Sequence, residues 1–174
     1  QLIARRIREA QVYCEIHPFN MSPKEVRDFA PSGLVLSGGP ASIYDRGAPL
    51  SDPAVLEMGV PVLGICYGMQ YLTHVLGGGV GGAADREYGN AEITVEDDAD
   101  LFYGFSRGGM EMVWMSHGDR IERMPDGFTA LARTTNSPVA AMADRARRFF
   151  GVQFHPEVAH TPNGVRILKN FLYR

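Results

Sequence analysis

The sequence is poor in cysteine and lacks the long apolar run that a membrane span would need. Two cysteines, Cys14 and Cys66, are too few for a disulfide framework. We therefore expect a reducing compartment, no signal peptide and a cytoplasmic location. Residues 60–84 contain no Asp, Glu, Lys or Arg, but Pro61 and a run of glycines make this stretch unsuitable as a spanning helix, so we expect no membrane contact.

Strong net charge and metal-ligand spacing are also missing. The net charge is −3, which gives no electrostatic reason to expect nucleic acid as a partner. The two cysteines lie far apart and the histidines are scattered, unlike the ligands of a zinc site. The glycine-rich residues 77–82 lack the Lys-Ser/Thr ending of a phosphate-binding loop. We therefore expect neither a metal nor a nucleotide cofactor in this chain.

What is present is the pattern of one α/β domain. The chain has 174 residues, of which 45% are hydrophobic, enough for one sizeable core. Apolar periodicity predicts helices over residues 2–10, after Ser22-Pro23, and over 67–76 and 163–172. Strand-like runs occupy residues 12–16, 33–37, 61–65, 91–95, 112–115, 128–134, 138–143 and 149–154. We predict an open, largely parallel central sheet with flanking helices and an antiparallel C-terminal extension.

The first predicted helix begins without the strand that normally precedes it in an α/β unit. Helical periodicity starts at Leu2, and no capping residue stands before it. We therefore expect residues 1–174 to form one domain that lacks its first N-terminal strand.

The sharpest local motif is a buried strand that runs into the turn Gly64-Ile65-Cys66-Tyr67-Gly68 and then into a helix. This is the cysteine form of the nucleophile elbow, in which a strained turn lifts the nucleophile above the sheet edge. The N-terminus of the following helix favours the thiolate, which is the reactive form. A structural cysteine in a glycine-rich turn would give the same local pattern, so this motif alone leaves both interpretations open.

A second motif ends another strand, at His155-Pro156-Glu157. Residues two apart in extended chain point to one side, so Glu157 can orient the imidazole of His155. A cysteine, a histidine and an orienting carboxylate form the triad of acyl transfer. His-Pro-Glu alone would more often be a turn, but together with the Cys66 elbow it favours catalysis.

A third motif, Ser37-Gly38-Gly39-Pro40, follows a further buried strand. Such a loop can present backbone N–H groups to a developing oxyanion. A tight turn that needs glycine for its backbone conformation explains the loop equally well when it is taken alone.

Together these motifs, with Met69-Gln70 and Phe154, resemble the class I (triad) glutamine amidotransferases over essentially the whole chain. More narrowly, the chain is similar to the glutaminase domains of GMP synthetases. That likeness rests on Arg86-Glu87-Tyr88-Gly89, on the residues from Val113 to Asp119, on those from Phe154 to Pro162, and on Ile167-Leu168-Lys169-Asn170-Phe171.

The resemblance implies a role for each matching residue. Cys66 would be the nucleophile, His155 the general base and acid, and Glu157 its orienter. The backbone N–H groups of Gly39 and Tyr67 would form the oxyanion hole. The substrate contacts implied are Gly38, Gln70, Ser116 and His117, although for His117 a structural or interface role stays open.

The resemblance also implies partners. L-Glutamine would be hydrolysed to glutamate and ammonia through a γ-glutamyl thioester. The ammonia would pass to an ATP-pyrophosphatase (synthetase) domain, in cis or in trans, that aminates XMP to GMP, and ATP and Mg²⁺ are expected only at that domain. Two alternatives are an amidotransferase or γ-glutamyl hydrolase of another pathway, and a catalytically silent module that regulates a synthetase. Residues 114–119 and 160–162 argue against the first, and the intact Cys66, His155 and Glu157 against the second.

Overall fold

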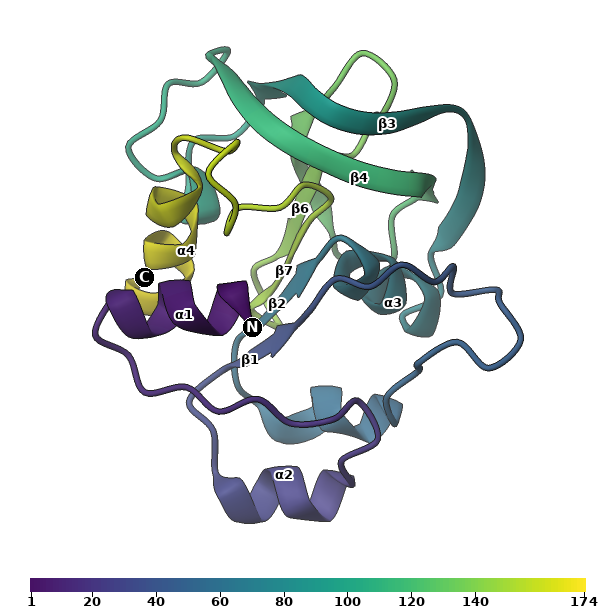
Figure 1. The fold of residues 1–174 in the computed structure, drawn as a ribbon, viewed down its shortest axis with the longest axis vertical. Helices are drawn as coiled ribbons and strands as arrows, with labels where there is room; N and C mark the ends of the chain where they lie inside the picture. The colour runs from purple at the N-terminus through teal and green to yellow at the C-terminus, as the bar shows by residue number, and fades with distance from the viewer.

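A computed structural model of the chain describes the backbone of all 174 residues and the side chains of residues 1–82 and 88–174. Within this described structure, helices cover both faces of one sheet (Figure 1). The helices are α1 (Leu2–Glu9), α2 (Pro23–Phe29), α3 (Tyr67–Val75) and α4 (Gly164–Tyr173), with the 3-10 segments η1 (Pro53–Met58) and η2 (Asp100–Phe102). The strands are β1 (Leu34–Leu36), β2 (Val62–Ile65), β3 (Gly79–Val95), β4 (Met110–Arg123), β5 (Thr129–Arg133), β6 (Ala141–Asp144) and β7 (Phe149–Val152).

The strands of the described structure form a sheet in the order β1-β2-β7-β6-β5-β3-β4. β1 and β2 pair in parallel, as do β2 and β7. From β7 onward every pairing is antiparallel. The predicted α/β fold class is therefore confirmed, with a parallel part that holds the three motif-bearing strands and an antiparallel part that continues from it.

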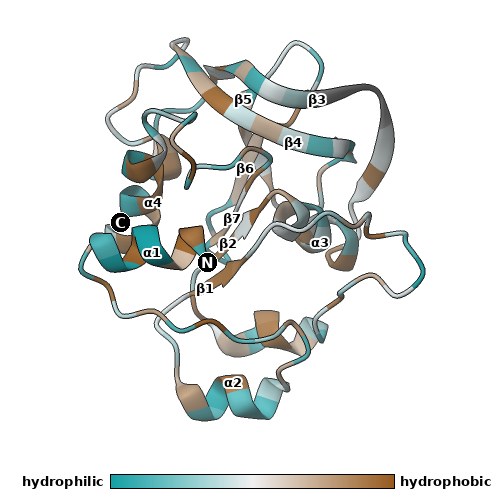
Figure 2. Ribbon diagram, viewed as in Figure 1, coloured by the Kyte–Doolittle hydropathy of each residue, from teal (hydrophilic) through white to brown (hydrophobic). Residues whose placement is uncertain are grey.

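Side chains of β2 alternate between two hydrophobic clusters, one on each face of the sheet. Leu63 and Ile65 belong to the cluster that includes Ile167 of α4, whereas Val62 belongs to the cluster that includes Leu72 of α3. All four β2 residues are buried, as expected for a parallel strand covered on both faces. Figure 2 shows this apolar centre in brown between α1 and α3.

The helices form where the sequence predicts them, within a residue or two at their ends. α2 begins with a capping box: the Ser22 side chain accepts a hydrogen bond from the backbone of Glu25, and the Glu25 carboxylate accepts one from the backbone of Ser22. The strands β1, β2, β5, β6 and β7 likewise coincide with predicted runs.

β3 and β4 form a curved hairpin across one end of the molecule that is much longer than the predicted strands (Figure 1). The strand predicted over residues 112–115 stops too early, because Ser116 to Asp119 also lie inside β4, where Ser116 pairs with Tyr88 and Asp119 with Gly82. Glycine is unfavourable in strands, so the glycine-rich partner strand gave no sign of this pairing in the sequence. The side chains of Arg86 and Glu87, which contribute to the resemblance, lie outside the described residues.

The strand predicted at residues 12–16 is also wrong. This segment forms no ladder with any described strand. The sheet ends at β1, and residues 12–16 lie across an open groove from that edge. A strand-like sequence cannot become a strand without a neighbour to pair with.

Candidate active site

Cys66 stands at the sharp turn between β2 and α3, where it is the N-cap of the helix. Its φ is 52° and its ψ is −109°, a conformation that side chains rarely adopt. The Cys66 N–H donates to the carbonyl of Val152 over 2.8 Å, and this hydrogen bond ties the turn to the neighbouring strand β7. Such a strained residue costs about 1–3 kcal/mol and is typical of catalytic turns.

The glycines on either side of Cys66 are required by close packing. A Cβ at Gly64 would lie 2.6 Å from the backbone of Gly68, and a Cβ at Gly68 would lie 2.1 Å from the carbonyl oxygen of Leu36. The elbow therefore brings β2, α3 and β1 closer together than any side chain allows, as the motif predicts.

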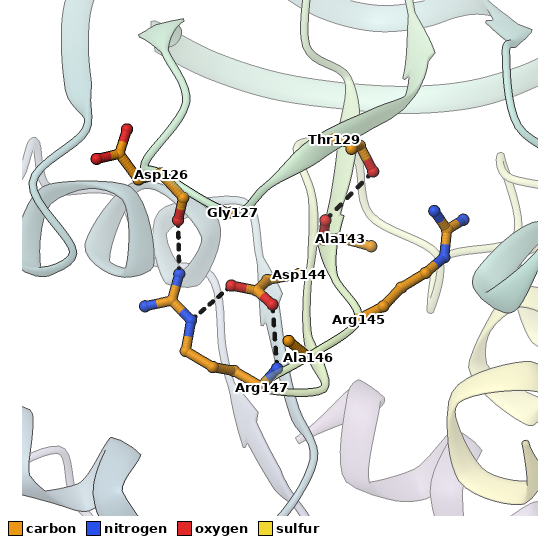
Figure 3. Close-up of a pocket in the computed structure, with 8 residues that line it drawn as sticks. All are labelled: Asp126, Gly127, Thr129, Ala143, Asp144, Arg145, Ala146 and Arg147. Carbon is orange, nitrogen blue, oxygen red and sulfur yellow. Dashed lines mark hydrogen bonds and ion pairs between the residues drawn. The ribbon is translucent and has the colours of Figure 1, made fainter.

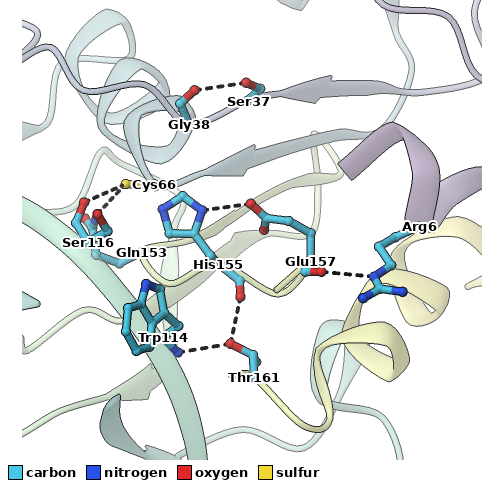
Figure 4. A network of polar contacts seen from close by, with 10 residues as sticks. All are labelled: Arg6, Ser37, Gly38, Cys66, Trp114, Ser116, Gln153, His155, Glu157 and Thr161. Atoms are coloured by element: carbon cyan, nitrogen blue, oxygen red, sulfur yellow. Dashed lines mark hydrogen bonds and ion pairs between the residues drawn. The ribbon is translucent and has the colours of Figure 1, made fainter. Parts of the chain in front are cut away.

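The thiol of Cys66 is buried, with two polar contacts (Figure 4). It donates to the backbone carbonyl of Ser116 in β4 over 3.7 Å. The carboxamide Nε2 of Gln153 donates to its Sγ over 3.8 Å. Gln153 therefore supplies a hydrogen-bond donor directly to the sulfur atom of Cys66.

His155 follows β7 and is held by its own backbone. Its N–H donates to the carbonyl of Trp114 over 2.9 Å, and its carbonyl accepts from the hydroxyl of Thr161 over 2.7 Å. The Thr161 hydroxyl in turn accepts from the Trp114 N–H over 3.0 Å. This closed set of bonds ties the histidine to β4, so its ring position does not depend on a loose loop.

The ring of His155 lies between Glu157 and Cys66 (Figure 4). Its Nδ1 is 2.9 Å from Oε1 of Glu157. Hydrogen bonding to the Cys66 side chain, and then to Glu157, raises the pKa of His155 to about 10 against the opposing effect of burial. The arrangement therefore favours a protonated imidazole between an acidic group on each side.

Glu157 is buried, and its backbone is anchored from the far end of the sequence. The Nε of Arg6 in α1 donates to the carbonyl of Glu157 over 3.0 Å. Among the described residues, Oε2 of Glu157 has no hydrogen-bond partner. All hydrogen bonding of this carboxylate is thus concentrated on His155, which suits an orienting role.

The loop after β1 packs against the same residues. A Cβ at Gly38 would lie 3.0 Å from Cε1 of His155 and 3.4 Å from Cβ of Cys66. The space beside these two side chains therefore has little room for any residue larger than glycine. A Cβ at Gly39 would lie 4.0 Å from the Tyr67 ring. In the described part of the chain no hydrogen bond uses the N–H of Gly39 or Tyr67. Both N–H groups are therefore available as donors to a substrate oxygen.

Of the remaining residues predicted to contact substrate, Ser116 lies beside Cys66, whereas Gln70 and His117 bond to the backbone of Asp119. The backbone carbonyl of Ser116 reaches the Cys66 thiol. The buried side chains of Gln70 and His117 instead meet at the carbonyl of Asp119, with Gln70 Nε2 at 3.1 Å and His117 Nδ1 at 2.8 Å. Their substrate contacts stay a prediction. The bond from Gln70 in α3 holds β4 against that helix, whereas the His117 contact lies within β4.

Sequence reasoning missed two residues of the site, Gln153 and Arg6. Gln153 could have been found, because it lies two residues before His155 at the end of a strand and so shares its side. Arg6 gives no local signal, since its contact with Glu157 spans 151 positions of the chain.

A second hollow, of about 460 Å³, lies at the turn between β6 and β7 (Figure 3). Its polar groups are already paired: Arg147 bridges the Asp144 carboxylate and the Asp126 carbonyl, and Arg145 bonds to Asp97 and Asp100. Arg145 thus ties the turn between β6 and β7 to the acidic residues that follow β3. We assign this hollow to the structure of the turn.

Searches for other kinds of site were negative over the described residues. Within them, no group of three or more His, Cys, Asp or Glu side chains is placed to hold a metal ion. The described helices also include none with the length and apolar character needed to cross a membrane.

The family model for "Glutamine amidotransferase class-I" matches residues 1–174. The chain belongs to this family. A crystal structure of a Thermoplasma acidophilum protein, provisionally assigned to GMP synthase, has a TM-score of 0.89 and 32% identity, and the match covers 99% of this chain and 85% of that one. A glutamine amidotransferase structure from Thermotoga maritima, with a TM-score of 0.68 and 23% identity over 98% of this chain and 74% of that one, shares the fold.

Two similar sequences carry the name "GMP synthase [glutamine-hydrolyzing]". The protein from Heliobacterium modesticaldum is 51% identical over 173 residues, and that from Solidesulfovibrio magneticus is 54% identical over 174 residues. Each match covers 99% of this chain. The chain spans about a third of the length of these curated relatives, 33% and 34% respectively.

Proposed function

We propose that this domain hydrolyses L-glutamine to glutamate and ammonia, with Cys66 as nucleophile, His155 as proton carrier and Glu157 as its orienter. The observation that carries the proposal is the position of the His155 ring, which lies beside the Cys66 side chain and is hydrogen-bonded to the Glu157 carboxylate (Figure 4). That arrangement matches the requirement of acyl transfer for a base beside the nucleophile and an orienter behind the base.

The reaction proceeds in two halves. The Cys66 thiolate attacks the carboxamide carbon of glutamine, a C–S bond forms, and the carbonyl electrons move to oxygen. The N–H groups of Gly39 and Tyr67 stabilise that oxyanion, each worth about 3 kcal/mol. The intermediate collapses, the C–N bond breaks, and the protonated His155 delivers its proton to the departing ammonia.

The second half returns the enzyme to its starting state. Neutral His155 takes a proton from water, and the resulting hydroxide attacks the thioester carbon. The C–S bond breaks, glutamate leaves, and Cys66 is again a thiolate beside a protonated His155. No cofactor takes part in either half within this domain.

We further propose that the ammonia serves the amination of XMP to GMP at an ATP-pyrophosphatase domain, in cis or in trans. Support comes from the name shared by the relatives and from their length, three times that of this chain. ATP and Mg²⁺ would act at that other domain, where the XMP carbonyl is activated.

Ammonia release from glutamine tests the first proposal. Cys66→Ala should reduce release to background, whereas the matched control Cys14→Ala should retain it, since the Cys14 thiol donates to the carbonyl of its neighbour Glu15 and not to a residue of the proposed triad. Equal release by Cys66→Ala and the unaltered chain would overturn the mechanism.

Mixing the chain with a purified XMP-aminating domain tests the second proposal. Glutamine-dependent GMP formation should appear only when ATP, Mg²⁺ and XMP are all present. Ammonia delivered to UTP or chorismate by the corresponding synthetases, but not to XMP, would overturn the pathway and leave glutamine hydrolysis intact.

A further inference from the structure

Thr161 lies in the loop that joins His155 to α4, and its side chain is turned inward. The residues on either side of it, 159–160 and 162–163, are exposed, whereas Thr161 is 4% exposed. Burying a hydroxyl costs free energy unless the group is hydrogen-bonded, so its partners indicate why it is there. The proposed reaction steps do not use this hydroxyl, so the reason for its burial lies in the structure around it.

The Thr161 hydroxyl connects the backbone of His155 to β4. Two residues that face each other in an antiparallel ladder can exchange two hydrogen bonds, one in each direction. His155 and Trp114 make one of these directly, from the His155 N–H to the Trp114 carbonyl over 2.9 Å. In place of the other, the Trp114 N–H donates to the Thr161 hydroxyl over 3.0 Å, and that hydroxyl donates to the His155 carbonyl over 2.7 Å (Figure 4). The hydroxyl is thus inserted into a strand pairing and sets the distance between His155 and β4.

This position requires one atom that accepts and donates a hydrogen bond at the same time. A hydroxyl oxygen does both, whereas a valine methyl group of nearly the same shape does neither. Without the hydroxyl, the Trp114 N–H and the His155 carbonyl can pair only by approaching each other to a direct bond of about 2.9 Å. That approach moves the His155 backbone toward β4 by on the order of 1 Å and takes its ring out of its place beside Cys66.

Thr161 is itself held within its loop. Its N–H donates to the carbonyl of Val158 over 3.1 Å, and its carbonyl accepts from the N–H of Gly164, the first residue of α4, over 3.0 Å. A Cβ at Gly164 would lie 2.0 Å from the carbonyl oxygen of Pro156, so the start of α4 packs directly against the residue after His155. The hydroxyl therefore has a fixed position from which it can place the histidine.

We propose that Thr161 is a positioning residue for glutamine hydrolysis, an inference that rests on the proposed function. Its hydroxyl acts as a spacer between β4 and the backbone of His155. The spacer sets how far the imidazole reaches toward Cys66 and keeps it aligned with Glu157. Thr161 acts through the His155 backbone and not by contact with the reacting atoms.

The order of activity among three replacements of Thr161 tests the proposal. Thr161→Ser keeps the hydroxyl and should keep the kcat for ammonia release within about threefold. Thr161→Ala leaves space beside two polar groups, where a water molecule can accept and donate, so kcat should fall by about 10-fold. Thr161→Val fills the space without a hydroxyl, so kcat should fall by about 100-fold while the KM for glutamine changes little. A residue that only fills space would give the opposite order, with Val nearest to the unaltered chain and Ala worst.

The matched control is Thr134→Val. Thr134 is also buried, and its hydroxyl accepts from the backbone N–H groups of Asn136 and Ser137 in the turn after β5. The valine variant loses these backbone hydrogen bonds but leaves the spacing at His155 unchanged. It should therefore lose stability in urea titrations and retain kcat.

Two results would overturn the proposal: equal kcat values for Thr161→Ser and Thr161→Val, or a loss in Thr161→Val that appears in KM and not in kcat. If Thr161→Val shows no cooperative unfolding transition, the comparison of Thr161→Ser with Thr161→Ala replaces it, and equal kcat values for these two refute the spacer. Cys66→Ala, measured in parallel, tests the proposed function separately, because ammonia release by that variant would refute the function whatever the order at position 161.

Discussion

Arg6, in the first helix, donates a hydrogen bond from Nε to the backbone carbonyl oxygen of Glu157 over 3.0 Å. The contact joins α1 to the loop that carries the orienting carboxylate (Figure 4). A residue near the start of the chain thus helps to position the proposed proton carrier His155, although it touches neither the thiol nor the imidazole.

Removing the hydrogen bond between Arg6 and Glu157 should reduce the rate of ammonia release. A hydrogen bond from a charged group contributes about 1.5–3 kcal/mol, so Arg6→Ala is expected to lower the kcat for ammonia release by roughly 10-fold or more. Arg6→Lys should recover part of the loss. The matched control is Arg5→Ala, since Arg5 is exposed and pairs with Glu9 on the helix surface. Equal kcat values for Arg6→Ala and Arg5→Ala would show that the contact has no positioning role.

Gln153 offers a prediction that separates reactivity from stability. Its Nε2 donates to the Cys66 sulfur, while its Oε1 has no partner among the described residues. Gln153→Leu removes the donor together with an unsatisfied buried carbonyl. We expect alkylation of Cys66 by iodoacetamide at pH 7 to slow by about 10-fold while the free energy of unfolding stays the same or rises. Faster alkylation would contradict a donor role for Gln153.

The raised pKa of His155 makes stability depend on pH. The folded protein holds the imidazole proton up to about pH 10, whereas the unfolded chain releases it near 6.5. This contribution to the free energy of unfolding is therefore fully present below pH 6.5 and is lost as pH rises toward 10. Urea titrations of the unaltered chain and of His155→Gln should differ most at pH 6 and converge by pH 10. A gap that widens with pH would contradict the assignment.

Gly38 is predicted to be sensitive for a steric reason. A methyl group there would lie 3.0 Å from Cε1 of His155, so Gly38→Ala must displace the ring from its place between Cys66 and Glu157. We expect kcat to fall by about 100-fold, as small misplacements of catalytic groups do, with thermal stability within a few degrees of the unaltered protein. The control is Gly82→Ala, where a Cβ meets no atom within 4 Å. Retained activity in Gly38→Ala would show that the loop moves freely.

The elements predicted well from the sequence are those with local causes. The capping box at Ser22 fixes the start of α2, and the glycines around Cys66 mark the elbow, because in each case a short run of residues determines its own geometry. The three motif segments also come together as expected, since parallel strands bring their carboxyl ends to one edge of a sheet.

The elements predicted poorly depend on distant partners. The β3–β4 hairpin extends through residues whose glycines suggest a turn, because each strand is stabilised by the other and not by its own propensity. Residues 12–16 fail for the opposite reason, as their strand propensity finds no neighbour. The hydrogen bond from Arg6 to Glu157 also depends on a distant partner. No spacing in the sequence predicts it, because the two residues come together only after folding.

At position 66 the fold and the chemistry favour different amino acids. A φ of 52° with a ψ of −109° suits glycine, and any other residue there destabilises the protein. A copy of this domain released from selection for its activity is therefore expected to accept glycine at this position and to become more stable by doing so. Among duplicated copies, the residue at the elbow would distinguish a domain under selection for catalysis from one that persists only as a scaffold.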